Sequence, residues 1–175
     1  MSKKIILAET AGFCFGVDRA VNLVYSLVND GKKVCTLGPI IHNAQLVGDL
    51  EQRGVKIIDS IDECPDGYMV VVRTHGVEKS VIDDIENKNI DYVDATCPFV
   101  KKIHRIVKKF DSSVPVLVAG DVNHPEVIGI RSYCNGKSFV FKNDEELQKI
   151  LQNDYIDKNE KIICVSQTTF SLEEW

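Results

Sequence analysis

The stretch Val93-Asp94-Ala95-Thr96-Cys97-Pro98-Phe99-Val100 decides the fold. An apolar, extended segment that starts at Ile90 ends at Asp94. Pro98 stands where a first helical residue is expected, because its fixed φ and missing N–H suit that position. Residues 99–110 carry apolar side chains at helical spacing. Cys97 is therefore predicted in a strand-to-helix turn, where the helix dipole and free N–H groups favour a thiolate that can bind a metal or act as a nucleophile.

Strand-like and helix-like runs alternate along almost the whole chain, which is typical of an α/β fold with mostly parallel sheets. The expected strands are 4–8, 33–37, 55–58, 68–72, 91–93, 114–119, 138–141 and 162–165. The expected helices are 17–28, 44–52, 79–88, 99–109, 125–133 and 144–151. A further helix is expected to begin at Ser171, with Glu174 at the capping-box offset. Because the sequence stops one turn into that helix, we expect a fragment of a longer protein.

Composition limits the class of protein. The 175 residues are 44% hydrophobic and 27% charged, which is ordinary for a globular protein of one large or two small domains. The apolar runs are too short for a membrane helix, and the first residues do not form a signal peptide. We therefore expect a cytoplasmic protein with no membrane partner. The net charge of −5 argues against nucleic acid as a partner, and the cytosolic setting argues against a disulfide framework for the six cysteines.

A weak internal repeat relates the two halves of the chain. The segment 11–17, which contains Cys14, matches 94–100, which contains Cys97, at a spacing of roughly 80 residues. The segment 37–43, ending in His42-Asn43, matches 119–125 with His124 at the same spacing. A looser match relates 72–75 to 166–169. The repeat predicts two α/β units, 1–94 and 95–175, each with a Cys loop, a His loop and a loop that bears His or Thr.

All six loops follow a strand and precede a helix, and such loops meet at the carboxyl edge of a parallel sheet, where α/β folds bind ligands. Two related units that face each other would bring Cys14 and Cys97 to a shared metal or cluster. The alternative is that both are small buried hydrophobic residues. The sequence contains no close Cys-x-x-Cys pair, which disfavours a zinc ribbon. A third unit after Trp175 would add a third cysteine and leave one iron of a cubane open.

The remaining candidates are polar residues of the same loops. His42, His75 and His124 suit a metal or an oxyanion, next to helix N-termini that favour phosphate; the alternative is a structural role. Glu126 lies in a helix first turn, where it either complements the dipole or delivers a proton. Thr168 and its neighbour Thr169 are candidates for a cap and for a pocket residue.

Other cysteines and one histidine are assigned no chemistry. Cys35 and Cys164 lie inside apolar strands and are expected in the core. Cys64 is a turn residue and Cys134 lies at a helix end, and neither is given a role. His104 stands among lysines and arginines of the helix after Cys97 and is expected on the surface.

Taken together, these motifs resemble the 4-hydroxy-3-methylbut-2-enyl diphosphate reductases, which complete the methylerythritol phosphate route to isoprenoids. The similar segments span the chain in the order of the family. They are 11–17 (AGFCFGV), 38–43 (GPIIHN), 73–76 (RTHG), 94–98 (DATCP), 123–127 (NHPEV) and 166–169 (SQTT).

The resemblance implies three α/β units in a trefoil around a [4Fe–4S] cluster, of which this chain holds two. Cys14 and Cys97 match two of the three cluster ligands, and the third would lie after Trp175. The three histidines match the diphosphate pocket, Glu126 the proton-supplying acid, and Thr168 a residue near it. Two electrons from ferredoxin or flavodoxin would remove the substrate hydroxyl as water, giving isopentenyl and dimethylallyl diphosphates. We expect an isolated chain of this length to lack full activity.

Two other functions are compatible with the residues alone. One is a non-catalytic iron–sulfur or metal-binding module, which would tolerate Glu126→Gln. The other is a thiol redox protein with Cys97 as its nucleophile, which would work without iron and be blocked by alkylation. A broad absorbance at about 400 nm in anaerobic full-length protein would distinguish an iron–sulfur protein from a thiol redox protein.

Overall fold

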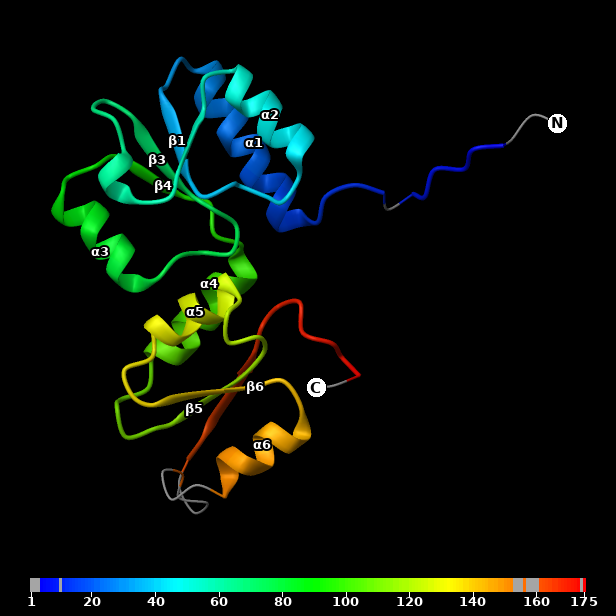
Figure 1. The fold of residues 1–175 in the computed structure, drawn as a ribbon, viewed down its shortest axis with the longest axis vertical. Coiled ribbons are helices and arrows are strands. Elements are labelled where there is room, and N and C mark those ends of the chain that lie inside the picture. Colours follow the sequence, from blue (N-terminus) through cyan, green and yellow to red (C-terminus); the bar gives the residue numbers. More distant parts are fainter. Residues whose placement is uncertain (1–3, 10, 153–155, 157–160, 174) are drawn as a thin grey trace.

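The computed structural model describes residues 4–9, 11–152, 156, 161–173 and 175. Two parallel β-sheets follow one another along the chain, and helices cover both faces of each sheet (Figure 1). The strands are β1 (Val34–Leu37), β2 (Lys56–Ile58), β3 (Met69–Val72), β4 (Tyr92–Asp94), β5 (Val116–Ala119), β6 (Ser138–Phe141) and β7 (Ile163–Ser166). The helices are α1 (Phe15–Asn29), α2 (Ala44–Gln52), η1 (Ile61–Glu63), α3 (Lys79–Asn87), α4 (Pro98–Lys108), α5 (Pro125–Ser132) and α6 (Asp144–Leu151).

The first sheet has the strand order β2-β1-β3-β4, and all of its pairs are parallel. Side chains alternate along each strand, so the two faces bury different sets. Val34 and Val71 pack with residues of α1 and α2 on one face. Leu37 and Val72 pack with residues of α3 on the other. Burial on both faces explains why these strands read as continuous apolar runs.

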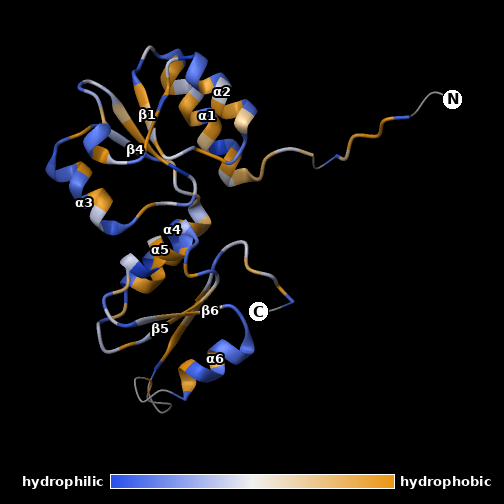
Figure 2. Ribbon diagram, viewed as in Figure 1, coloured by the Kyte–Doolittle hydropathy of each residue, from blue (hydrophilic) through white to orange (hydrophobic). Residues whose placement is uncertain are grey.

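The second sheet has the order β6-β5-β7 and is also parallel. Val116 and Val118 of β5 pack with α4 and α5, whereas Leu117 packs with residues of α6 on the opposite face. The strands are mainly apolar, whereas the helices carry both apolar and hydrophilic residues (Figure 2). The predicted α/β class with parallel sheets is confirmed.

One predicted strand is wrong. Residues 4–8 pair with neither sheet and extend away from the rest of the chain (Figure 1). Ile5 and Leu7 are 92% and 82% exposed. An apolar run forms a strand only when a neighbouring strand satisfies its N–H and C=O groups, and this segment pairs with none of the strands β1 to β7. The short helix η1 was not expected; Ser60 caps it by accepting a hydrogen bond from the Asp62 N–H.

The helix expected at Ser171 is represented by one turn of hydrogen bonding. The Trp175 N–H donates to the Ser171 carbonyl at 3.1 Å. The Ser171 hydroxyl accepts from the Glu173 N–H at 3.2 Å. The capping-box residue Glu174 lies outside the described residues. Within the described part of the chain, no helix combines the length and apolar character needed to cross a membrane.

Candidate functional site

Three histidines from separate loops lie together where the strands end. His42 follows β1, His75 follows β3, and His124 lies between β5 and α5. The His42 and His75 ring centroids are 5.8 Å apart, and those of His75 and His124 are 5.5 Å apart. His75 is thus the centre of the row. Two of the imidazoles come from the first sheet and one from the second, as expected if the carboxyl edges of both sheets face a common site.

His75 is neutral at neutral pH because its surroundings disfavour the charged form. Burial lowers the pKa of His75 to about 4, with further lowering by His124, Arg73 and His42. A neutral imidazole offers one N–H donor and one acceptor. Arg73 is a permanent positive charge close enough to lower this pKa, and an anion bound beside it would oppose that effect. The imidazole donors next to this guanidinium therefore suit an anionic ligand.

Glu126 is a buried carboxylate whose two oxygens are both held by Thr168. Oε1 accepts a hydrogen bond from the Thr168 backbone N–H at 2.6 Å, and Oε2 accepts from the Thr168 hydroxyl at 2.8 Å. Glu126 is only 1% exposed, whereas Thr168 is exposed. The threonine hydroxyl therefore connects the buried acid to the more exposed part of the site.

His124 is oriented by the helix that it caps. Its Nδ1 accepts a hydrogen bond from the Glu126 backbone N–H at 3.2 Å. Pro125 suits the first helical position of α5, since it needs no hydrogen-bond acceptor there. With Nδ1 accepting, the proton of a neutral His124 lies on Nε2, which leaves an N–H donor for a ligand. The cap thus links the histidine row to the Glu126–Thr168 pair.

Cys14 and Cys97 occupy matching positions in the fold. Cys14 is the N-cap of α1 and Cys97 is the N-cap of α4. Both thiols are free, and in the described structure neither makes a capping hydrogen bond. A Cβ atom built on Gly16, in the first turn of α1, would lie 2.7 Å from the Cys97 Sγ. The first turn of α1 therefore contacts the second cysteine directly.

The Cys97 loop also contacts the histidine row. The Cys97 N–H donates to the Thr74 carbonyl at 2.9 Å, one residue before His75. A Cβ built on Gly76 would lie 3.2 Å from Cγ2 of Thr96. The cysteine loop and the central histidine loop therefore pack against each other.

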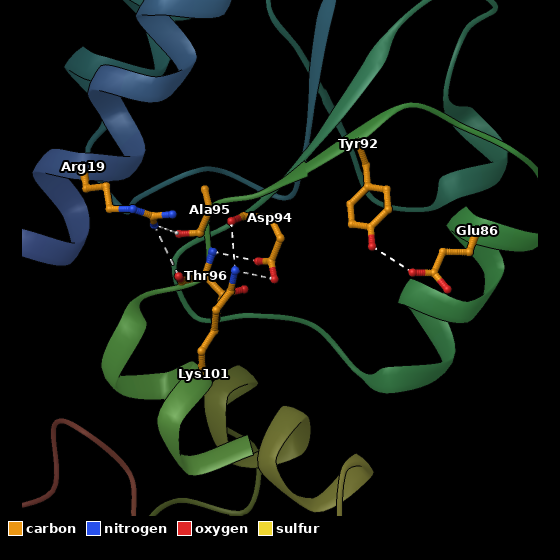
Figure 3. Close-up of polar contacts among 7 residues, drawn as sticks. All are labelled: Arg19, Glu86, Tyr92, Asp94, Ala95, Thr96 and Lys101. Atoms are coloured by element: carbon orange, nitrogen blue, oxygen red, sulfur yellow. Dashed lines mark hydrogen bonds and ion pairs between the residues drawn. The ribbon is translucent and has the colours of Figure 1, made fainter. Parts of the chain in front are cut away.

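Charged residues hold the loop before Cys97 from two helices (Figure 3). Arg19 of α1 donates to the carbonyls of Ala95 and Thr96 at 3.4 and 3.5 Å. The Asp94 carboxylate accepts from the Thr96 N–H at 2.9 Å and pairs with Lys101 of α4 at 2.7 Å. Burial raises the pKa of Asp94, but the hydrogen bonds from Lys101 and Thr96 outweigh this and leave the pKa below its usual value. Asp94 is therefore ionised where it organises the turn.

The donor set suits a soft metal centre, although it is incomplete. Two free thiols at helix N-termini are ligands of the kind that iron–sulfur clusters use. Among the described residues, no group of three or more His, Cys, Asp or Glu could hold a metal ion. In the part of the chain that the structure describes, these two thiols therefore belong to no complete metal site.

Two sequence-based assignments outside the site are wrong. His104 is buried, at 8% exposure, and its ring stacks on Tyr133 with centroids 4.2 Å apart. It lies on the face of α4 that packs against α5, whereas its neighbours Lys102 and Arg105 are exposed. Cys164 is exposed: it lies on the edge strand β7, between Ile163 and Val165, whose side chains pack in the core on the other face of the strand. Cys35 is buried as expected.

Sequence reasoning assigned no role to Arg19, Lys101 or Arg73. The Arg73 guanidinium packs over Gly38, where a Cβ would lie 2.6 Å from its Nη1. Gly38 has a φ of 71°, a conformation that favours glycine. A glycine directly after β1 could have indicated in the sequence that another group, here Arg73, packs against the backbone at Gly38. Nothing local in the sequence indicates that Arg19 reaches a loop far along the chain.

The buried histidines predict a loss of stability in mild acid. Burial lowers the pKa of both His75 and His104 from 6.5 to about 4. Between these values the unfolded chain binds more protons than the folded chain, so stability falls as the pH falls through this window. We expect about 2 kcal/mol of loss from the better-buried His104, after allowance for solvent screening. Urea unfolding at a series of pH values measures it.

His104→Phe is the matched test, because a phenyl ring can keep the stacking on Tyr133 without titrating. It also removes Nε2, a buried atom with no hydrogen-bond partner among the described residues. We expect a flatter stability profile in this variant and an unchanged one in Lys102→Gln, an exposed site on the same helix. An unchanged slope in His104→Phe would contradict the assignment.

Comparison with known proteins agrees with this arrangement. The family model described as LytB protein matches residues 5–175. The 4-hydroxy-3-methylbut-2-enyl diphosphate reductase of Thermoanaerobacter sp. (strain X514) is 40% identical over 177 residues, covering 98% of this chain and 59% of that protein. The reductase of the same name from Geotalea daltonii is 44% identical over 171 residues, covering 97% and 58%. The chain thus spans about 59% of the length of the curated relatives it matches.

Solved structures give the same result. The E-1-hydroxy-2-methyl-but-2-enyl-4-diphosphate reductase from Plasmodium falciparum superposes with a TM-score of 0.83 at 27% identity, covering 95% of this chain and 52% of that one. A second structure, of (E)-4-hydroxy-3-methyl-but-2-enyl diphosphate reductase, the terminal enzyme of the non-mevalonate pathway, superposes with a TM-score of 0.78 at 40% identity, covering 97% and 59%.

Proposed function

Because this chain belongs to the LytB protein family, we propose that the whole protein to which it corresponds is a 4-hydroxy-3-methylbut-2-enyl diphosphate reductase. On this proposal the chain carries part of the active site, since it spans about 59% of the length of its relatives. The reaction removes the substrate hydroxyl as water with two electrons and gives isopentenyl and dimethylallyl diphosphates.

One observation carries the proposal: a row of three imidazoles lies next to a buried carboxylate that is hydrogen-bonded to an exposed threonine. The imidazoles suit the anionic diphosphate, and the carboxylate suits proton delivery to a leaving hydroxyl. A metal-binding module without catalysis would need neither the buried acid nor its hydroxyl partner. The combination favours a reductive dehydroxylase over the two alternatives.

We propose that His42, His75 and His124 bind the diphosphate. His124 presents Nε2–H because its Nδ1 accepts from the Glu126 N–H. Asn43 caps α2 by accepting from the Leu46 N–H, so the N-terminus of that helix lies next to His42 in the chain. Helix N-termini and imidazole N–H donors together favour a polyanion. Holding the diphosphate fixes the position of the hydroxyl at the other end of a short substrate.

We propose that Glu126 supplies the proton for the departing hydroxyl through Thr168. The hydrogen bond of 2.8 Å between the Thr168 hydroxyl and Oε2 provides the route, and the exposed threonine is the member of the pair that a ligand can reach. A positioned general acid of this kind increases rates by about 10²–10⁴-fold. The backbone bond from Thr168 to Oε1 keeps the carboxylate in place during the transfer.

We propose that Cys14 and Cys97 are two of the cysteine ligands of a [4Fe–4S] cluster, with a third ligand in the part of the whole protein that this chain does not span. The supporting observations are two free thiols at helix N-termini and the contact of Gly16 with Cys97. When bound, such a cluster supplies electron transfer and Lewis-acid chemistry. Ferredoxin or flavodoxin is the proposed electron donor, and the cytoplasm is the proposed location.

We also propose that residues 1–94 and 95–175 are two related α/β units. In support, β4 is the last strand of the first sheet and ends at Asp94. Val107 of α4, which follows the boundary, packs with the core of the second sheet. Each unit places one cysteine at a helix N-cap.

The decisive experiment uses full-length protein purified without oxygen. We expect a broad absorbance at about 400 nm. We also expect substrate-dependent oxidation of a reduced one-electron dye, with isopentenyl and dimethylallyl diphosphates as products. An absorbance without product formation would favour a non-catalytic module. Activity that survives iron removal and is lost on alkylation would favour a thiol redox protein.

A further inference from the structure

A second pair of cysteines lies in direct contact, away from the candidate site. The sulfurs of Cys35 and Cys64 are 3.5 Å apart, and both residues are free thiols. Cys35 belongs to β1 and is fully buried. Cys64 follows η1 in the loop that leads to β3. Packing alone does not require a thiol at these positions, because a buried free cysteine acts as a small hydrophobic residue.

The pair lies toward the amino ends of the strands, opposite to the histidine row. Cys64 lines a pocket of about 530 Å³ together with residues that precede β1, β3 and β4. Three lysines share this lining, Lys32, Lys33 and Lys88. Cys64 is partly exposed and lines the pocket, whereas Cys35 is fully buried in the sheet.

We propose that Cys35 and Cys64 form a reversible oxidative modification site, in which a peroxide oxidises Cys64 and Cys35 then closes a disulfide. In the first step the Cys64 sulfur attacks one peroxide oxygen, the O–O bond breaks, and Cys64 becomes a sulfenic acid with release of water. In the second step the Cys35 sulfur attacks the Cys64 sulfur, the S–O bond breaks, and the oxygen leaves as a second water with the Cys35 proton. The two thiols lose two electrons in all, which the peroxide gains.

The environments of the two thiols assign their order of reaction. Burial and the contact with Cys64 raise the pKa of Cys35 to about 12, so Cys35 stays protonated and does not compete for the oxidant. Cys64 is the member that the pocket reaches. Cys35 is the thiol nearest to Cys64, with their sulfurs 3.5 Å apart, and in the second step its proton is taken by the departing hydroxyl as the S–S bond forms. This is the arrangement of a reactive cysteine beside a resolving one.

A disulfide requires a small movement at Cys64, because the sulfurs must approach each other by about 1.5 Å to reach the usual bond length. Cys64 follows the one-turn helix η1 and lies in the turn that contains Gly67, which has a φ of 75°. This turn lies outside the ladder between β1 and β3, which begins at Met69.

In the test, the 175-residue chain is treated with hydrogen peroxide and its remaining free thiols are blocked. Linked peptides are then identified by mass spectrometry. We expect a Cys35–Cys64 linked peptide that disappears when a dithiol reductant is added. Cys64→Ser should abolish it, whereas Cys134→Ser, a half-buried thiol elsewhere, should leave it unchanged. Far-UV circular dichroism of each variant verifies folding.

A second measurement separates the proposal from simple packing. In Cys35→Ala, the sulfenic acid on Cys64 has no resolving partner, so labelling by dimedone at Cys64 should rise above that of the unmodified chain. Peroxide-treated protein without the linked peptide, or equal dimedone labelling in both proteins, would overturn the proposal. Because Cys64 is partly exposed, Cys64→Ser remains informative even if Cys35→Ala fails to fold. Neither result depends on the proposed reductase activity.

Discussion

Glu126→Gln is expected to lower the turnover of the full-length holoenzyme by about 10²–10⁴-fold, the range for losing a general acid. Glutamine has the shape of glutamate, and its amide oxygen can still accept from the Thr168 N–H as Oε1 does now. It cannot hold or release a proton at the other position, where Oε2 now accepts from the Thr168 hydroxyl at 2.8 Å. The fold should persist while proton delivery is lost.

The measurement is steady-state turnover together with iron and sulfide content of anaerobic protein. Glu145→Gln is the matched control, because Glu145 holds the same position in the first turn of α6 but is exposed. Thr168→Ser should retain most activity and Thr168→Val should lose it, since only serine keeps the hydroxyl. Full turnover in Glu126→Gln with normal cluster content would refute the proton role.

Gly16→Ala is expected to disturb Cys97 more than any other single methyl group added along α1. The new Cβ would lie 2.7 Å from the Cys97 Sγ and 3.2 Å from its Cβ, closer than side chains pack. Both atoms belong to a residue whose backbone is fixed by Thr74 and whose preceding loop is fixed by Arg19 and Lys101, so it has little room to move. Overpacking of this kind costs about 1–3 kcal/mol.

Two readouts distinguish the effect on the site from the effect on the fold. For Gly16→Ala we expect a lower midpoint of urea unfolding in the 175-residue chain. In anaerobic full-length protein we expect a loss of the absorbance at about 400 nm. Gly48→Ala is the matched control: it lies in α2 with nothing near its added Cβ, so it should be neutral or stabilise by about 0.5–1 kcal/mol. Equal behaviour of the two variants would mean that α1 does not constrain Cys97.

Local sequence patterns predicted most of the framework. Helices α2 and α6 occur at the predicted residues because asparagine caps and amphipathic spacing define their ends. Failures occurred where a partner decides the outcome. Residues 4–8 have strand composition but pair with neither sheet. His104 lies among basic residues, yet the packing of α4 on α5 buries it.

The candidate site was predictable as a set of residue types but not as a geometry. Cys97 and His124 could be placed because proline follows each of them and begins a helix. The pairing of Glu126 with Thr168 links residues from different elements, which spacing in the sequence cannot show. The same limit applies to Arg19, whose partners lie in the loop after β4. The repeat pointed to which loops converge, and tertiary packing determined which atoms meet.

The row of imidazoles has a mechanical consequence. Its members are attached to two separate sheets, with His42 and His75 on one and His124 on the other. A ligand bound by all three would connect the two sheets, and its binding free energy would stabilise their association. With ligand bound, the two sheets are therefore expected to unfold in one cooperative transition. The melting temperature should then rise with the fraction of the protein that holds ligand.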